Sequence, residues 1–166
     1  MLTHSSVPDY DLLADQLKAL TMSERDRIPG LANASALIYD ALPDLNWCGF
    51  YLTVPSKLSS TSYPYDLLLG PFQGKTACIR IPYGKGVCGT AAGKDEIQLV
   101  PDVHLFPGHI ACDSASNSEI VIPMHRCDGT VAGVLDIDSP LPGRFSQEDA
   151  GGLARLVRIL EGNCDL

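Results

Sequence analysis

The sequence predicts an α+β fold in which a central, mostly antiparallel sheet carries the N- and C-terminal helices on one side. Two observations indicate this arrangement. Amphipathic helical patterns lie at the two ends of the chain, and short strand patterns joined by turns fill the middle. The length of 166 residues suits one domain, and no repeat or linker divides the chain. We therefore expect a single domain over residues 1–166.

Helical periodicity marks three segments. Apolar residues recur at helical spacing over about residues 9–22, and again after Pro29-Gly30 as far as residue 42. Near the C-terminus, Ser146 precedes Asp149 by three residues, which is a capping pattern, and apolar positions continue to residue 160. Two helices are therefore expected to open the chain and one to close it.

Strand patterns occupy the middle of the chain and are separated by turn-rich stretches. The sequence CDGT at 127–130 predicts a hairpin turn between the last two strands, and the polar stretch 55–64 predicts a mobile loop. The six expected strands cover residues 46–54, 66–70, 76–81, 97–100, 119–126 and 131–138.

Charge and composition restrict the partners. Twenty acidic residues against twelve basic ones give a formal net charge of −8, which opposes binding to nucleic acid or to an anionic membrane. A small neutral or zwitterionic ligand fits better. No apolar run approaches the length of a membrane span, and the first residues do not resemble a secretory signal. Six cysteines without such a signal point to a reducing compartment, so we expect a cytoplasmic protein.

A glycine-rich segment, GKGVCGT, follows residue 83. Gly84, Gly86 and Gly89 satisfy the GxGxxG spacing of dinucleotide-binding turns, but the parallel βαβ context of such turns is missing. The pattern favours a tight turn into a short helix. Cys88 would then lie near the amino end of that helix, where exposed N–H groups favour a thiolate.

Acidic residues occur at the ends of apolar strands. Alternation places Ala132, Val134, Asp136 and Asp138 on one face of the last strand, and Glu119 begins its hairpin partner. A solvated sheet face would explain a single Asp, but three acids on buried strands are costly unless a ligand is bound. They could hold an ammonium group, or some could stay protonated and donate a hydrogen bond.

Trp47 and Tyr51 share one face of the first strand. Core packing would account for both rings. An aromatic wall would also suit a ligand with an apolar, sulfur-containing end, because sulfur–aromatic contacts contribute roughly 0.3–1.5 kcal/mol. Composition does not choose between these two interpretations.

Cys112 differs from the other cysteines in its surroundings. It lies within GHIACDSASNSEIV, a segment rich in small and hydroxyl residues, and close to His109. A Cys–His hydrolase built on these two residues and a zinc module built on Cys78, Cys88, Cys112 and a His are open alternatives, although no CxxC motif is present. Packing or incidental roles are expected for the remaining thiols, Cys48, Cys127 and Cys164.

Four segments together carry a resemblance to a known family. They are NWCGFYL, LLLGPFQGKTACIRIPYGKGVCGTA, DVHLFPGHIACDSASNSEIVIP and GVLDIDSPLPGRFSQED. In these segments the chain resembles the free methionine-(R)-sulfoxide reductases, which are built on a GAF domain, and the resemblance runs over about residues 31–160. It implies a GAF fold and reduction of free methionine sulfoxide without a cofactor or metal.

The resemblance also implies roles for individual residues. Three would be redox thiols: Cys112 as nucleophile, Cys78 as resolving thiol and Cys88 as a third thiol able to join the exchange. Five would bind the substrate, namely Trp47, Tyr51, Glu119, Asp136 and Asp138. The chain departs from the family pattern in a longer 55–64 loop and an added thiol, Cys127.

The chemistry of a sulfoxide agrees with these residue types. Its oxygen leaves poorly until it is protonated, so an acid is needed beside the attacking thiolate. Attack would release methionine and leave a sulfenic acid, which a second thiol converts into a disulfide that a thioredoxin-type reductant reopens. A homodimer is compatible with this scheme. The main alternative is a GAF domain that senses a small ligand without turnover.

Overall fold

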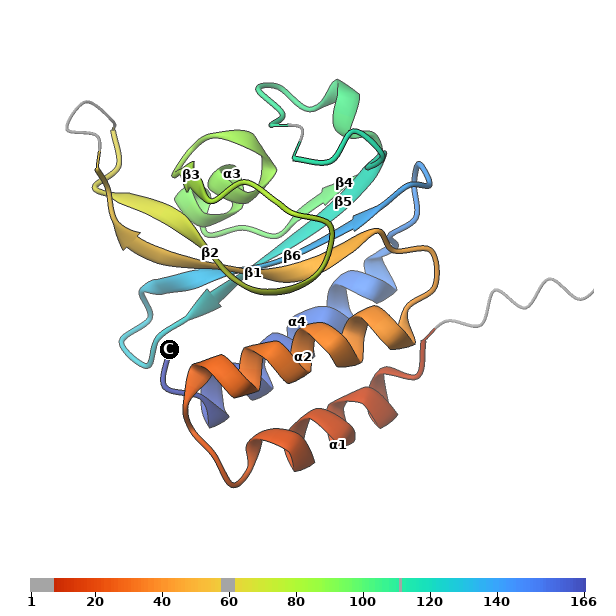
Figure 1. Ribbon diagram of the computed structural model, residues 1–166, viewed down its shortest axis with the longest axis vertical. Coiled ribbons are helices and arrows are strands. Elements are labelled where there is room, and N and C mark those ends of the chain that lie inside the picture. Colours follow the sequence, from red (N-terminus) through yellow and green to blue (C-terminus); the bar gives the residue numbers. More distant parts are fainter. Residues whose placement is uncertain (1–7, 58–61, 111) are drawn as a thin grey trace, which may run out of the picture.

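A computed structural model describes residues 8–57, 62–110 and 112–166. Its core is one six-stranded sheet in the order β3-β2-β1-β6-β5-β4, in which each neighbouring pair is antiparallel (Figure 1). The strands are β1 (Trp47–Pro55), β2 (Tyr65–Gly74), β3 (Arg80–Pro82), β4 (Gln98–Val100), β5 (Ser118–His125) and β6 (Val131–Ser139). The prediction of an antiparallel α+β fold is confirmed.

Helices cover the two faces of the sheet unequally. One face carries the terminal helices α1 (Tyr10–Thr21), α2 (Arg27–Ala41) and α4 (Gln147–Asn163), with α1 farthest from the sheet (Figure 1). The opposite face carries α3 (Gly86–Lys94) and the short 3₁₀ helix η1 (Val103–Leu105). The expected placement of the N- and C-terminal helices on one side is confirmed.

The helix-side face contains the larger apolar core. Phe50 on β1 and Leu135 on β6 are completely buried there, together with Leu153 on α4. Burying such side chains stabilises the fold by roughly 1.5–3 kcal/mol each. The predicted capping box also forms, because Ser146 Oγ accepts from the Asp149 amide at 3.2 Å and Asp149 Oδ2 accepts from the Ser146 amide at 2.8 Å. Helix α4 is thereby fixed at its start.

Helix α2 begins earlier than the sequence pattern predicted. Its first residue is Arg27, and Asp26 caps it by accepting from the Ile28 amide at 2.8 Å. Pro29 lies in the first turn, where a missing N–H costs no intrahelical hydrogen bond. Gly30 is buried against Cys164, whose Sγ would lie 2.6 Å from an added Cβ. The Pro-Gly pair is thus part of the helix and does not precede it.

The strand expected over residues 76–81 is largely absent. Only β3, at the end of that range, pairs with β2. Before it, side chains of β1 bind backbone carbonyl groups: Trp47 Nε1 donates to Lys75 O at 3.1 Å and Tyr51 Oη donates to Cys78 O at 3.0 Å. These side-chain hydrogen bonds take the place of a strand ladder and hold the backbone at Lys75 and Cys78 close to β1.

The predicted face of Ala132 is wrong. Val134 and Asp136 lie on the α3 side as expected, but Ala132 packs in the helix-side core. The pairing of β5 with β6 shifts register between Met124 and His125, so β6 contains one extra residue there. Such a bulge reverses the alternation on its far side.

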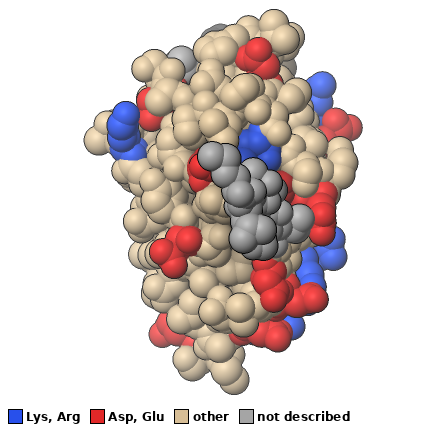
Figure 2. Space-filling model, turned by 90° about the vertical axis from the view of Figure 1, so that its right-hand side faces the viewer, with Lys and Arg blue, Asp and Glu red and all other residues tan. Residues whose placement is uncertain are grey.

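The expected 55–64 loop joins β1 to β2 and is described only in part, because residues 58–61 lie outside the described ranges. Ser56 N donates to Pro64 O at 2.9 Å, so the loop begins as a continuation of the hairpin. No helix in the described part of the chain is long and apolar enough to cross a membrane. On the face shown in Figure 2, Lys and Arg lie at separate places among Asp and Glu.

Candidate functional site

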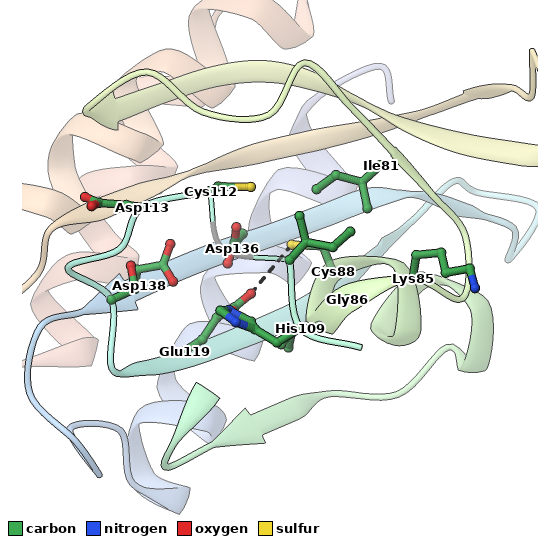
Figure 3. A pocket seen from close by; sticks show the side chains of 13 residues that line it. Ile81, Lys85, Gly86, Cys88, His109, Cys112, Asp113, Glu119, Asp136 and Asp138 are labelled. Atoms are coloured by element: carbon green, nitrogen blue, oxygen red, sulfur yellow. Dashed lines mark hydrogen bonds and ion pairs between the residues drawn. The ribbon is translucent and has the colours of Figure 1, made fainter. Parts of the chain in front are cut away.

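A pocket lies on the α3 side of the sheet, between the start of β5, the end of β6, the amino end of α3 and the loop before β5 (Figure 3). Because β5 and β6 are antiparallel, the first residues of one strand lie beside the last residues of the other. Glu119 therefore pairs with Asp138, and Asp136 lies two residues away on the same face. All three carboxyl groups line the pocket, as predicted.

Cys112 also lines this pocket, and it forms a disulfide with Cys78. The two Cα atoms are 5.7 Å apart, although the residues are separated by 34 positions in the sequence. The pair that the family resemblance implied is thus brought together by the fold. Cys78 belongs to the segment that Trp47 and Tyr51 hold through its carbonyl groups.

Cys88 is the third residue of α3, and its side chain is buried against the acids. Its Sγ lies 3.9 Å from Glu119 Oε1, at hydrogen-bonding distance for a thiol donor. Burial raises the pKa of Cys88 well above its usual value, and the nearby Asp136 and Glu119 carboxyl groups raise it further. The expectation of a thiolate at this helix end is therefore wrong. A helix dipole contributes at most ~2 kcal/mol, which is less than the cost of burying a second anion beside the acids.

Two of the three acids are almost fully enclosed, and Asp138 is partly exposed. Glu119 and Asp136 each expose 6% of their surface, and burial raises the pKa of Glu119 and of Asp138 well above the usual range. Burial likewise raises the pKa of Asp136 to about 6. Asp136 Oδ1 has no hydrogen-bond partner among the described residues. The pocket therefore contains two acids, Glu119 and Asp138, that can donate a hydrogen bond when protonated. It also contains one carboxyl oxygen, Asp136 Oδ1, that lacks a donor.

The predicted aromatic residues line a smaller adjoining cavity. The rings of Trp47 and Tyr51 stack with centroids 5.8 Å apart, and the ring of Phe72 also stacks on Trp47 with centroids 5.2 Å apart. The two cavities share Cys112 and the β6 acids. The aromatic wall and the acids thus meet at Cys112. The two rings also pack against each other in a buried cluster, which is the packing role considered from the sequence.

The loop that carries Cys112 is held by a set of polar contacts that the sequence only partly indicated. Asp113 Oδ1 accepts from the Ala115 amide at 2.9 Å, a short-range turn typical of Asp. Asn46 Nδ2 donates to Asp113 Oδ2 at 3.2 Å and to Ser116 Oγ at 3.0 Å. The Ala115 and Asn46 hydrogen bonds keep the pKa of Asp113 below its usual range. Asn46 was not predicted, because it lies 67 residues from its partner.

His109 faces Glu119, with Nε2 3.9 Å from Oε2, and burial lowers its pKa. Two alternative functions considered from the sequence, a Cys–His hydrolase and a zinc module, lack the free thiols that they need in this structure. A Cys–His hydrolase requires Cys112 as a free thiol, and the proposed zinc module requires Cys78 and Cys112 as separate ligands. Both sulfurs are instead used in one disulfide.

The remaining cysteines lie away from the pocket. Cys48 and Cys164 are buried in the helix-side core. Cys127 is exposed in the β5–β6 turn, at the opposite end of β5 from Glu119. These positions agree with the packing and incidental roles expected for them.

Comparison with known proteins places the chain in a family. It matches the GAF domain model over residues 28–162. Free methionine-R-sulfoxide reductase of Escherichia coli is 51% identical over 152 residues, which cover 92% of this chain and 86% of that protein. The protein of the same name from Saccharomyces cerevisiae is 47% identical over 171 residues, covering 98% and 92%. The structure of free methionine-R-sulfoxide reductase from Neisseria meningitidis in complex with its substrate is 41% identical, with a TM-score of 0.83 and coverage of 93% and 87%.

An antiparallel six-stranded sheet with terminal helices on one face and a pocket on the other is, by these matches, a GAF domain. The chain belongs to the GAF-domain family and, within it, to the free methionine-R-sulfoxide reductases.

Proposed function

We propose that this chain reduces free L-methionine (R)-sulfoxide to L-methionine, with Cys112 as the nucleophile. The proposal rests on the position of the Cys78–Cys112 disulfide beside three carboxyl groups, two of them buried, that line one pocket. The names of the related proteins from bacteria and yeast support the substrate and its stereochemistry.

The first step needs a thiolate and a proton donor. The Cys112 thiolate attacks the sulfoxide sulfur, and a proton from the pocket is added to the sulfoxide oxygen. The oxygen is then transferred to Cys112 Sγ, while its bond to the substrate sulfur and the transient bond between the two sulfurs break, which leaves a sulfenic acid on Cys112. Glu119 and Asp138 are suited to supply that proton, because burial keeps them protonated to higher pH than ordinary carboxyl groups. Methionine is the reduced product, and Cys112 is the group that has been oxidised.

The second step restores the thiol. The Cys78 thiol attacks the sulfenic sulfur of Cys112, which gives the disulfide and releases the oxygen as water. A dithiol donor of the thioredoxin type then reduces this disulfide and becomes oxidised itself. Cys112 lines both cavities, whereas Cys78 lines neither. We therefore assign Cys78 as the sulfur that the donor attacks, so that Cys112 leaves as a thiolate facing the pocket. Cys88, buried against Glu119, serves as the reserve thiol.

Substrate recognition follows from the charge of the pocket. Trp47 and Tyr51 provide an apolar wall for the thioether end of the substrate, for which sulfur–aromatic contact is favourable. Asp136 presents a carboxyl oxygen without a partner, and a free α-ammonium is the cation that balances it.

A non-catalytic sensor is the alternative function. It would use the same fold and pocket, but it would not need a disulfide between Cys78 and Cys112. Multiple turnover distinguishes the two, because a sensor binds methionine sulfoxide without converting it.

The experiment is an assay of free methionine (R)-sulfoxide with a thioredoxin system, in wild type and in two cysteine variants. Cys112→Ser should reduce kcat/KM by at least about 1,000-fold, as removal of a nucleophile does in other enzymes. Cys127→Ser, which removes an exposed thiol remote from the pocket, is the matched control and should retain wild-type activity. Substantial multiple turnover by folded Cys112→Ser would refute the proposal.

A further inference from the structure

Three potential metal ligands meet in the pocket from three separate elements. Cys88 comes from α3, Glu119 from β5 and Asp136 from β6, and all three are buried. Their ligand atoms lie within 4.8 Å of one another. His109 adds a nitrogen at the rim, 3.9 Å from the second oxygen of Glu119. Figure 3 shows these four side chains around one space.

One buried carboxyl oxygen of this cluster has no partner, which points to a bound cation. In the described ranges, 8–57, 62–110 and 112–166, no Lys or Arg forms an ion pair with Glu119, Asp136 or Asp138. Asp136 is 6% exposed, its side chain lines the pocket (Figure 3), and its Oδ1 has no hydrogen-bond partner among the described residues. A buried carboxyl oxygen in this position is costly unless a donor or cation reaches it.

We propose that Cys88, Glu119, Asp136 and His109 bind a zinc ion, which occupies the substrate pocket as an inhibitor. In a tetrahedral zinc site, ligand atoms about 2.0–2.3 Å from the metal lie about 3.4–3.6 Å from each other. Cys88 Sγ lies 3.9 Å from Glu119 Oε1, and His109 Nε2 lies 3.9 Å from Glu119 Oε2. The His109 side chain would move inward to join the other three ligands, whose atoms already lie within 4.8 Å of one another. A thiolate among the ligands favours zinc over calcium or magnesium, which prefer oxygen donors.

The size of the cavity favours an ion as the occupant of the disulfide-bonded state. Its volume is about 30 Å³, which is room for about two water molecules and too little for a whole amino acid. Zinc would bind Asp136. This step rests on the proposed function, in which Asp136 binds the ammonium group of the substrate. The ion and the substrate would therefore exclude each other, and zinc would slow the enzyme.

The test uses purified protein with the Cys78–Cys112 disulfide intact, so that neither of those sulfurs can be a thiolate ligand. Zinc chloride titrated by calorimetry should bind at one ion per chain. Loss of a direct ligand in Cys88→Ser or Asp136→Asn should weaken binding by more than the 10–100-fold typical of losing an outer hydrogen-bond partner. Cys127→Ser should bind as wild type does. Cobalt in place of zinc should give a thiolate charge-transfer absorption that Cys88→Ser loses and Cys127→Ser retains.

Three outcomes would overturn the proposal: no binding to wild type, binding unchanged in both Cys88→Ser and Asp136→Asn, or a cobalt spectrum without thiolate absorption. Thermal melting of each variant establishes that it is folded, and the near-isosteric Asp136→Asn protects the test against a structural effect of Cys88→Ser. Binding is measured without substrate or reductant. A chain that binds zinc but has no reductase activity would contradict only the proposed function, and an active chain that binds no zinc would contradict only this site.

Discussion

Successive residues of β6 serve opposite purposes on the two faces of the sheet. Leu135 and Ile137 point into the helix-side core, where they are completely buried among apolar side chains. Asp136 and Asp138 point into the pocket, where burial opposes their charge and one carboxyl oxygen has no donor. The helix-side face therefore stabilises the fold. The pocket face destabilises it, because it holds acids whose burial is unfavourable unless a ligand is bound.

An asparagine placed on each face of β6 should change the free energy of unfolding by very different amounts. Ile137→Asn should lower the free energy of unfolding by about 3–5 kcal/mol, because it removes apolar contacts and buries an amide without partners. Asp136→Asn, one residue away, should stay within about 1 kcal/mol of wild type, because it removes a costly buried acid. Urea unfolding followed by circular dichroism measures both. Equal losses in the two variants would contradict the division of roles between the faces.

The next prediction distinguishes the roles of the two cysteines in the disulfide. Cys78→Ser should release about one methionine per chain in a single turnover and then stop cycling with a thioredoxin-type donor, because the sulfenic acid lacks its partner. Quantifying methionine in the first turnover and at steady state provides the measurement. Normal cycling, with mass spectrometry showing Cys88 joined to Cys112, would exchange the roles of Cys78 and Cys88.

The smallest expected effect lies outside the pocket, at the rim of the helix-side face. His125 bonds Asp95 through Nε2 at 2.7 Å and Glu161 through Nδ1 at 2.9 Å, in a groove that Arg158 also lines. Burial alone would lower the pKa of His125, but the hydrogen bonds to Asp95 and Glu161 outweigh it and raise the pKa above its usual value. Because the folded state binds the proton more tightly, this stabilisation is complete below the unfolded pKa of about 6.5. It is lost as the pH rises through the folded value.

The difference in melting temperature between wild type and His125→Gln should therefore be larger at about pH 6 than at about pH 9. Activity of the variant should not change, since the residue lies outside the pocket. A difference that is equal at the two pH values would show that His125 acts through packing instead of charge.

Local patterns predicted the parts of the fold that depend on local geometry. Alternation correctly placed Trp47 and Tyr51 together, because β1 pairs with β6 without a register shift over those residues. The turn after β5 was predicted correctly because the residues CDGT at 127–130 are typical of a hairpin turn. Ala132 was misplaced because the bulge is visible only in the pairing of two strands. The strand expected before Arg80 failed because side chains from β1, distant in the sequence, bind its carbonyl groups.

The site was predicted less by spacing than by resemblance. Nothing in the 34 residues between Cys78 and Cys112 indicates that they pair, and only the family likeness suggested it. For Cys88, the local sequence pointed to a thiolate, whereas burial, together with the carboxyl groups on β5 and β6, keeps the thiol protonated. Charge states depend on tertiary neighbours, which a local pattern does not contain.

In the proposed function, the acids on the pocket face recognise a free amino acid beside Cys112. The most direct measurement is kcat/KM for free methionine (R)-sulfoxide and for its N-acetyl derivative, in wild type and in Glu119→Gln, Asp136→Asn and Asp138→Asn. Acetylation removes the ammonium and leaves a buried carboxylate unpaired, which costs ~2–5 kcal/mol, or roughly 30-fold to several-thousand-fold. We expect wild type to prefer the free amino acid by that factor and Asp136→Asn to lose most of the preference. Equal efficiency on both substrates in wild type would contradict the claim.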